Sequence, residues 1–325
     1  MKKYLLFLFT FVSLVATAQE EEEDVAPEGW SSEGKFQLLF NQSAFNKEWS
    51  GGGTSSLAGN LTVDYQLNYR KGNFSWDNKV LANYGITQLK GDEFSRKTSD
   101  RLEINSIAGR ELDDSNWYYS FFTNFRTQFT KGYVYSEDKA TGEKFRTETT
   151  HFMSPAYLQF GPGMMWKKND DLLVNIAPAT SRFIFVDDAF TSVPGYQDGA
   201  YYGVDAGKSS RYELGASINA YAKFGIMENV SMENTLSLYS NYLSNPQNVD
   251  IDYLMNLEMG INKLLTANLI FQAIYDDNTV GAFQIREVLE PPLTSIFRKL
   301  PQQFLRTFRE GKTLNFPTFE EHQFA

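Results

Sequence analysis

The chain has 325 residues, a formal net charge of −10 and no cysteine. The missing cysteines exclude a disulfide framework and a lipid-anchored amino terminus, and the acidic balance argues against nucleic acid as a partner. Aromatic residues make up 15% of the chain and charged residues 22%. An aromatic-rich but polar chain is typical of strands that have one face in lipid and the other in water.

Residues 1–18 have the features of a secretory signal peptide. Two lysines follow Met1, the apolar segment from Tyr4 to Val15 is too short to span a bilayer, and residues 16–18 read Ala-Thr-Ala. We expect cleavage before Gln19 and an acidic N-terminal leader over residues 19–33. The mature chain is then expected either in a soluble exported state or in the outer membrane.

Alternation of apolar and polar residues is the main secondary-structure signal. From Leu61 to Tyr69 every second residue is Leu, Val or Tyr, and the alternation resumes from Phe74 to Val80 after a polar turn. A period of two predicts a β-hairpin with one apolar and one polar face. The same pattern predicts twelve strands, near residues 35–45, 55–69, 74–87, 101–110, 117–129, 155–166, 171–186, 209–224, 230–242, 250–261, 264–275 and 283–289.

The connections between these strands alternate between short and mostly longer segments. Outer-membrane barrels have this pattern because their periplasmic turns are tight and their external loops are long, with both termini periplasmic. A secreted β-sandwich with crossing connections has no reason to alternate, and it is kept as the alternative fold. We therefore predict an all-β protein, an antiparallel up-and-down transmembrane β-barrel of about 12 strands over residues 34–289.

The expected last strand is unusual. Phe283 to Leu289 spans seven residues, fewer than the roughly 9 to 11 that a transmembrane strand needs. Pro291 and Pro292 follow after Glu290, and proline cannot donate a hydrogen bond to a neighbouring strand. We predict that residues 290–325 form an atypical C-terminal tail, irregular or partly helical and poorly ordered, as expected of a replaced or frame-shifted terminus.

Four segments carry a resemblance to a known family: FNQ to WSGGG at residues 40–53, FSWDN at 74–78, LYSNYLSNPQN at 238–248 and IYDD at 274–277. The chain resembles the domain of unknown function 3078 family of exported, outer-membrane β-barrel proteins over most of residues 30–288. The resemblance implies an exported barrel, and it implies no activity, cofactor or site residue.

Charged residues on the polar parity of the strands are candidates for the barrel lumen. Seven acids and six bases can act as a charged constriction that selects a solute, or they can pair and fill a narrow interior. Their near balance favours pairing. These residues are Asp64, Asp77, Lys79, Arg101, Glu103, Arg126, Arg211, Glu213, Lys223, Glu233, Asp252, Glu258 and Arg286.

No catalytic, cofactor or metal site is predicted. His151 and Ser154 suggest a phospholipase-like esterase, but residues three apart in a strand point to opposite faces. Acidic residues 276–277 with Asn278 are at best a weak calcium site in a loop. The external-loop candidates for ligand contact are Trp49, Tyr196, Tyr201 and Tyr202, although a mobile surface loop is the favoured interpretation of residues 192–208.

We therefore expect a non-enzymatic outer-membrane barrel, either a narrow channel for a small solute or an accessory or structural barrel of an envelope complex. Its expected partners are outer-membrane lipid and other envelope proteins, with no cofactor and no nucleic acid. The alternatives are an outer-membrane esterase and a soluble secreted β-sandwich binding protein. A water path past the level of Arg126 would favour transport, and a filled interior would favour a structural role.

Overall fold

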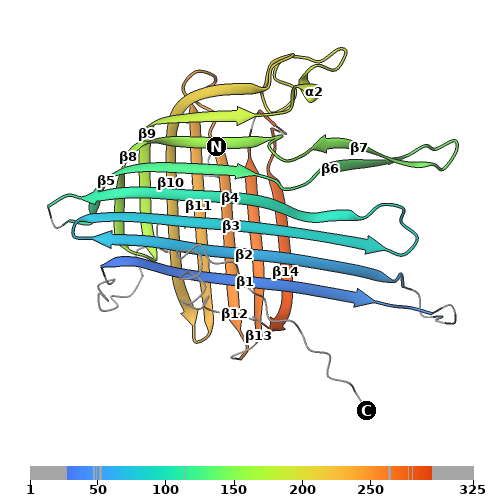
Figure 1. Cartoon of the computed structure of the whole chain (residues 1–325), viewed down its shortest axis with the longest axis horizontal. Helices are drawn as coiled ribbons and strands as arrows, with labels where there is room; N and C mark the ends of the chain where they lie inside the picture. Colours follow the sequence, from blue (N-terminus) through green and yellow to red (C-terminus); the bar gives the residue numbers. More distant parts are fainter. Residues whose placement is uncertain are drawn as a thin grey trace, which may run out of the picture.

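The computed structural model describes residues 28–46, 48, 50, 53–113, 115–262, 265–276, 278–279 and 281–294. Twelve strands form one antiparallel sheet, and their order in the sheet follows their order in the chain (Figure 1). They are β1 (Gly29–Ser43), β2 (Ser56–Lys71), β3 (Phe74–Leu89), β4 (Arg96–Glu111), β5 (Trp117–Thr127), β8 (Ala156–Asn169), β9 (Leu172–Phe185), β10 (Ser210–Met227), β11 (Val230–Asn241), β12 (Asp250–Gly260), β13 (Leu265–Tyr275) and β14 (Gln284–Thr294).

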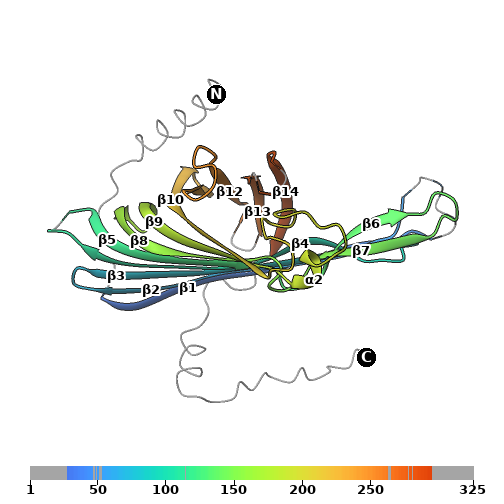
Figure 2. The same ribbon diagram turned by 90° about the horizontal axis from the view of Figure 1, so that it is seen from above.

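The sheet curls so that its first and last strands approach each other. β1 to β5 form one layer, and β12 to β14 stand to one side of it (Figure 2). Lys35 Nζ on β1 lies 2.5 Å from Glu258 Oε2 on β12, and Asn268 Nδ2 on β13 donates to Gln37 Oε1 on β1 at 3.4 Å. Among the described residues no backbone ladder joins β1 to β14. The predicted twelve-stranded antiparallel barrel fold is confirmed, as a curled sheet rather than a closed ladder.

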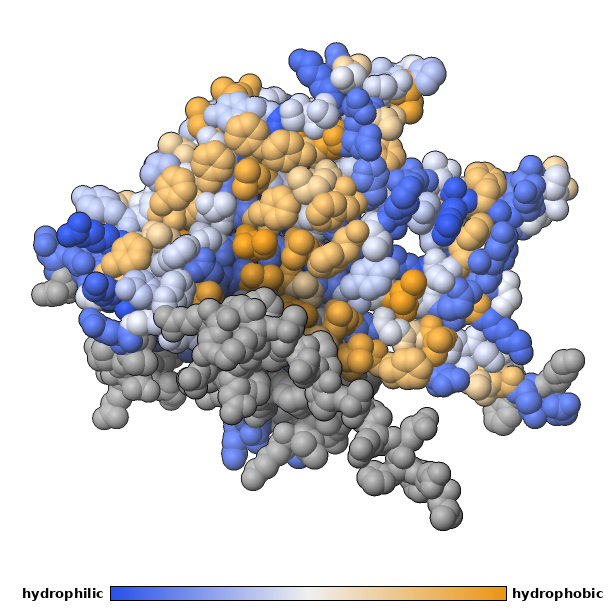
Figure 3. All heavy atoms as spheres, in the orientation of Figure 1, coloured by the Kyte–Doolittle hydropathy of each residue, from blue (hydrophilic) through white to orange (hydrophobic). Residues whose placement is uncertain are grey.

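Side chains alternate between the outer and inner faces of the sheet. On β1, Phe36, Leu38 and Phe40 share the outward face and are 41%, 56% and 64% exposed. Hydrophobic side chains gather over the middle of the molecule, between hydrophilic ends (Figure 3). Trp30 lies close to Tyr69 and Trp76 beside the β2–β3 turn, with ring centroids 5.0 and 5.7 Å apart. Aromatic clusters beside the turns of a barrel are typical of the membrane interface.

Both ends of the sheet extend beyond the predicted boundaries. β1 begins at Gly29, so residues 29–33 are strand rather than leader, paired with residues 66–70 of β2. β14 continues to Thr294, past the two prolines that were expected to end it. The ladder to β13 shifts register there, which accommodates residues that cannot donate. The signal peptide, residues 19–27 of the leader and residues 295–325 lie outside the described residues, and their assignments stay predictions.

Two elements were not predicted. The β5–β8 connection contains a separate two-stranded sheet of β6 (Gly132–Glu137) and β7 (Lys144–Thr150). The β9–β10 connection contains α2 (Asp188–Thr191), and the side chain of Asp187 caps it by accepting from Ala189 N at 2.8 Å. Within the described residues, no helix combines the length and the apolar character required to span a bilayer.

Candidate functional site

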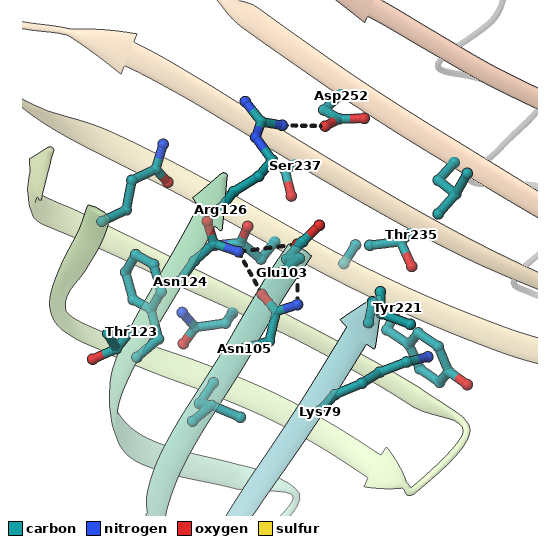
Figure 4. A pocket seen from close by; sticks show the side chains of 18 of the residues that line it. Lys79, Glu103, Asn105, Thr123, Asn124, Arg126, Tyr221, Thr235, Ser237 and Asp252 are labelled. Carbon is teal, nitrogen blue, oxygen red and sulfur yellow. Dashed lines mark hydrogen bonds and ion pairs between the residues drawn. The ribbon is translucent and has the colours of Figure 1, made fainter. Parts of the chain in front are cut away.

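A cavity of about 250 Å³ lies inside the sheet (Figure 4). Its lining includes Asp170, from the short β8–β9 turn, and Asp276, from the long β13–β14 connection. Arg126 on β5 lines the cavity between these two ends. The cavity therefore extends past the level of Arg126 in both directions along the barrel.

An ion-pair cluster crosses the middle of this cavity. Arg126 Nη1 lies 2.7 Å from Asp252 Oδ2 on β12, and four strands of the sheet separate β5 from β12. Arg101 Nη2 lies 3.6 Å from the same carboxylate oxygen and also pairs with Glu103. Asn124 Nδ2 donates to Glu103 Oε1 at 3.0 Å (Figure 4). The four charges hold opposite walls together and neutralise one another.

A second cross-lumen pair lies closer to the short turns. Lys79 Nζ on β3 lies 2.6 Å from Glu233 Oε1 on β11 and 3.3 Å from Asp64 Oδ2 on β2. The ammonium also lies 5.5 Å from the centroid of the Tyr221 ring, within the range of a cation–π contact. This lysine bridges two carboxylates on strands that are far apart in the sheet.

A third cluster ties the turn end of the barrel. Lys167 Nζ on β8 lies 2.7 Å from Asp77 Oδ2 on β3 and 2.7 Å from Asp170 Oδ1. Arg70 at the end of β2 pairs with both carboxylates. Burial of Asp170 opposes its ionisation, but Lys167 and Arg70 outweigh that effect and lower the pKa of this turn carboxyl below its ordinary value.

At the other end, Arg182 on β9 is the centre of a buried network. It is 4% exposed, and its Nη1 lies 2.5 Å from Asp250 Oδ2 and 3.6 Å from Glu213 Oε2. Its Nη2 lies 3.9 Å from Asp276 Oδ2, and its guanidinium lies 4.7 Å from the centroid of the Tyr239 ring. Three carboxylates thus share contacts with the single guanidinium of Arg182.

The β9–β10 connection, residues 186–209, packs against the barrel wall at this end, and we call it the lid. Val204 in the lid is fully buried against Tyr157 and Ile184, which belong to the barrel wall. Tyr202 meets the Tyr157 ring edge-on at 6.4 Å, and Tyr157 lines the cavity. Arg211 Nη1 donates to Gly203 O at 3.0 Å and to Asn278 Oδ1 at 3.2 Å. The lid therefore contacts β8 directly and is linked to the β13–β14 connection through Arg211 of β10.

Polar contacts fasten the lid to β7 and to the turn that follows it. Tyr201 OH donates to Thr149 O at 2.6 Å, and loss of solvent raises the pKa of Tyr201 to about 12, so it remains a donor at neutral pH. His151 lies between two carboxylates, with Nδ1 2.9 Å from Glu148 Oε1 and Nε2 3.2 Å from Asp187 Oδ2. The histidine thus links the β6–β7 hairpin to the first residues of the lid.

The geometry of His151 and Ser154 differs from the expected strand. The two residues face each other across a tight turn, and each backbone N–H donates to the other's carbonyl at 2.9 Å. Ser154 is 1% exposed, and its Oγ accepts from Asp187 N at 2.9 Å. The reasoning from strand parity was wrong here because the segment is a turn. In this structure the hydroxyl and the imidazole are held by other groups.

Most of the predicted lumen residues come together in these clusters. Arg211 Nε also lies 2.9 Å from Glu213 Oε1, and Glu258 pairs with Lys35. Lys223 lies opposite Glu233 in the β10–β11 ladder, and Arg286 lies opposite Gln272 in the β13–β14 ladder. Among the loop candidates, Tyr196, Tyr201 and Tyr202 belong to the lid, whereas Trp49 lies outside the described residues.

Sequence reasoning missed several charged residues of the site. Arg182 was missed because a register shift in β9, between Ala177 and Thr180, changes which parity faces inward. Arg70, Lys167, Asp170 and Asp276 stand at strand ends or in connections, where alternation carries no information. Among the described residues, no group of three or more His, Asp or Glu residues is arranged to hold a metal ion.

Comparison with known proteins gives one family match. Residues 40–133 match the family described as Protein of unknown function (DUF3078). The resemblance predicted from the sequence is confirmed over this segment, which runs from β1 to the start of β6. None of the curated proteins with which the chain was compared is similar to it.

Two solved structures share a distant likeness with the chain. The translocator domain of the autotransporter NalP from Neisseria meningitidis is 9% identical with a TM-score of 0.32, and the match covers 84% of this chain and 90% of that one. The β domain of the Bordetella autotransporter Brka is 10% identical with a TM-score of 0.29, and the match covers 82% of this chain and 98% of that one.

Proposed function

We propose that the protein is a narrow, non-enzymatic outer-membrane channel for a small solute, held closed by its lid and by ion pairs across the lumen. The observation that carries this proposal is the extent of the cavity. It is lined both by Asp170 in a short turn and by Asp276 in a long connection, and so it continues past Arg126. A barrel with a purely structural role has no need of a space that extends between its two ends.

The outer surface supports a membrane location. The exposed side chains of Phe36, Leu38 and Phe40 face outward on β1, and the outward parity of β12 from Ile251 to Met259 is entirely apolar or aromatic. Such a surface would associate in water, whereas in a bilayer it is solvated by hydrocarbon. The short turns are placed in the periplasm and the long connections outside, as the usual arrangement of these barrels implies.

An accessory or structural role is the second candidate, and the cross-lumen ion pairs favour it. Arg126 with Asp252 and Lys79 with Glu233 join walls that are four or more strands apart, which stiffens the barrel. The same pairs leave no wide aqueous pore. A channel built in this way conducts only when the lid moves or when solute displaces bound water.

Planar-bilayer conductance of the purified, refolded protein separates the two candidates. The native chain is compared with a variant in which residues 192–208 are replaced by a short Gly-Ser linker. We expect small, infrequent conductance steps from the native protein, and larger or more frequent steps from the variant. If both proteins insert as folded barrels and neither conducts, the channel proposal is wrong and the structural role is favoured.

A further inference from the structure

We infer that this channel admits cations in preference to anions of the same size, because carboxylates outnumber cationic groups at its outer end. The inference rests on the proposed function and names the class of solute for the same cavity. It follows from the charges around Arg182, from the way this arginine is covered and from the charges of the lid. An uncharged solute is neither attracted nor repelled by such a field, so its entry is governed by size alone.

The outer end of the cavity holds more negative than positive charge. Arg182 shares its guanidinium among Asp250, Glu213 and Asp276, and Arg211 adds one further cation beside Glu213. Three carboxylates therefore face two guanidinium groups. Asp250, Asp276 and Arg182 line the cavity, so a solute at this end meets two carboxylates for one arginine. Rings of carboxylates of this kind are the usual means by which a channel favours cations.

Glu213 strengthens the negative field without touching the solute. Its side chain is 1% exposed, and neither carboxylate oxygen has a hydrogen-bond partner among the described residues. Arg182 at 3.6 Å and Arg211 at 2.9 Å are therefore ion-pair partners without hydrogen-bond geometry. A protein interior screens the field of such a buried carboxylate less than water does. The field stabilises a cation in the cavity and destabilises an anion.

The cation of this cluster that lines the cavity is poorly placed to bind an anion. The Arg182 side chain is 5% exposed, compared with 17% for Asp250 and 13% for Asp276. Its guanidinium lies 5.4 Å from the centroid of the Tyr157 ring and 4.7 Å from that of the Tyr239 ring, within cation–π range. An anion would have to displace Asp250 or a ring to reach the guanidinium, whereas a cation can approach the more exposed carboxylates directly.

The lid adds negative charge at the same end of the barrel. It begins directly after β9, the strand that carries Arg182, and it is linked through Arg211 to the β13–β14 connection, which carries Asp276. An entrance of one sign with walls of low dielectric constant concentrates counter-ions, so cations gather here and anions are depleted. The lid contains four aspartates and one lysine, namely Asp187, Asp188, Asp198, Asp205 and Lys208.

Deeper in the cavity the charges are close to balance. Around Arg126 and Asp252 two carboxylates face two guanidinium groups, and Lys79 lies between Asp64 and Glu233. Over its whole length the lining contains six Asp or Glu side chains and five Lys or Arg side chains. The outer end therefore sets the sign of the preference.

Reversal potentials in planar bilayers test this sign. The native chain and the variant with residues 192–208 replaced by a Gly-Ser linker, both inserted as folded barrels, are compared in gradients of potassium chloride. We expect potassium to permeate several-fold better than chloride in both proteins. The preference should weaken at about 1 M salt, where charges are screened within about 3 Å, compared with about 10 Å at 0.1 M. Equal permeabilities, or a preference for chloride, overturn the inference and leave the channel standing. No conductance in either protein overturns the channel as well.

Substitutions at Asp276 assign the preference to the outer end. Asp276 Oδ2 lies 3.9 Å from Arg182, and its Oδ1 accepts from Asn278 N at 2.8 Å, a bond that an asparagine side chain can keep. Asp276→Asn should therefore lower the ratio of potassium to chloride permeability several-fold, and Asp276→Lys should lower it further.

Glu143→Gln is the matched control, because it removes a carboxylate from the tip of the β6–β7 hairpin, on the same side of the barrel but outside the cavity lining. It should behave as the native chain. Folding of each variant is verified by heat-modifiable electrophoresis. Equal permeability ratios in the native chain and in all three folded variants would show that the outer carboxylates do not set the preference, which overturns the inference.

Discussion

Arg126 on β5 and Asp252 on β12 join opposite walls of the barrel through a contact of 2.7 Å between Nη1 and Oδ2. Both side chains are largely buried, at 27% and 18% exposed, and Gln272 Nε2 donates to the other carboxylate oxygen at 3.0 Å. The pair is therefore fixed in position by a third strand.

Removing both members of this pair should cost less than the sum of the costs of removing each alone. Asp252→Asn leaves Arg126 and Arg101 without their shared carboxylate, and we expect a loss of up to about 3 kcal/mol in the free energy of unfolding. The double variant Arg126→Gln with Asp252→Asn should lose less than the sum of the two single variants. Urea titration in lipid vesicles measures this coupling. Additive losses would mean that the two side chains are not energetically linked.

A charge on the outward face should impair assembly, and the same charge one residue away should not. Leu257→Arg places a guanidinium in hydrocarbon between Met232 and Leu269, at a cost of roughly 2 to 4 kcal/mol. Asn256→Arg points inward and lies opposite Glu233, which can pair with it. Folding yield in vesicles, read by heat-modifiable electrophoresis, should fall only for the first. Equal effects would indicate a sheet buried on both faces.

Protease-cleavable tags should report the orientation of the barrel. A tag in residues 138–142, at the tip of the β6–β7 hairpin, should be cleaved on intact cells because that tip lies on the side of the long connections. A tag in residues 71–73, in the β2–β3 turn, should be cleaved only after the outer membrane is permeabilised. The reverse pattern would invert the topology.

The contacts of His151 should control how firmly the lid is held. His151→Ala removes both carboxylate contacts, so limited proteolysis within residues 192–208 should become several-fold faster. Phe152→Ala changes the exposed neighbour, which is 53% accessible, and serves as the matched control. If cleavage is equally slow in both variants, the contacts of His151 do not hold the lid, and its other contacts, such as those of Val204, Tyr201 and Gly203, are sufficient.

Low pH should weaken the attachment of the lid through His151 and Glu148. The hydrogen bond from Lys131 and the contact with His151 lower the pKa of Glu148 in the folded protein below its ordinary value of 4.5. Its stabilising effect is therefore fully present above that ordinary value and is lost as the pH falls through the depressed folded value. Proteolysis of the lid should accelerate only as the pH falls below the ordinary value of 4.5. Glu148→Gln should remove this acid step, and an unchanged step in that variant would show that Glu148 does not cause it.

Alternation along the chain was sufficient to locate all twelve strands, because each has one face toward an apolar environment. The predicted strand boundaries were wrong where a segment of strand does not show this alternation. Residues 29–33 carry one large apolar side chain, Trp30, yet form strand through backbone pairing with β2. β14 passes Pro291 by a register shift rather than by a change in pattern. The β6–β7 hairpin carries no apolar alternation, since it projects beyond the sheet (Figure 1).

The sequence predicted that charged residues line the lumen, but it did not predict which of them form ion pairs. Parity placed Arg126 and Asp252 in the lumen, but only the curvature of the sheet brings β5 to β12. Residues 192–208 were interpreted as a mobile surface loop, with their tyrosines as candidates for ligand contact. The attachment of this segment through His151 depends on a turn that alternation cannot reveal. Arg182 could have been found only by allowing for the bulge that separates it from Ala177.

The most direct test of the account uses the absence of native cysteine. Thr235 on β11 lines the cavity, and its neighbour Leu236 points outward. Single variants Thr235→Cys and Leu236→Cys are reconstituted, and glucose-driven swelling is measured before and after complete reaction with N-ethylmaleimide, verified by mass. We predict that modification at position 235 blocks entry of glucose and that modification at position 236 does not. Unchanged entry after full modification at position 235 would contradict a solute path through this barrel.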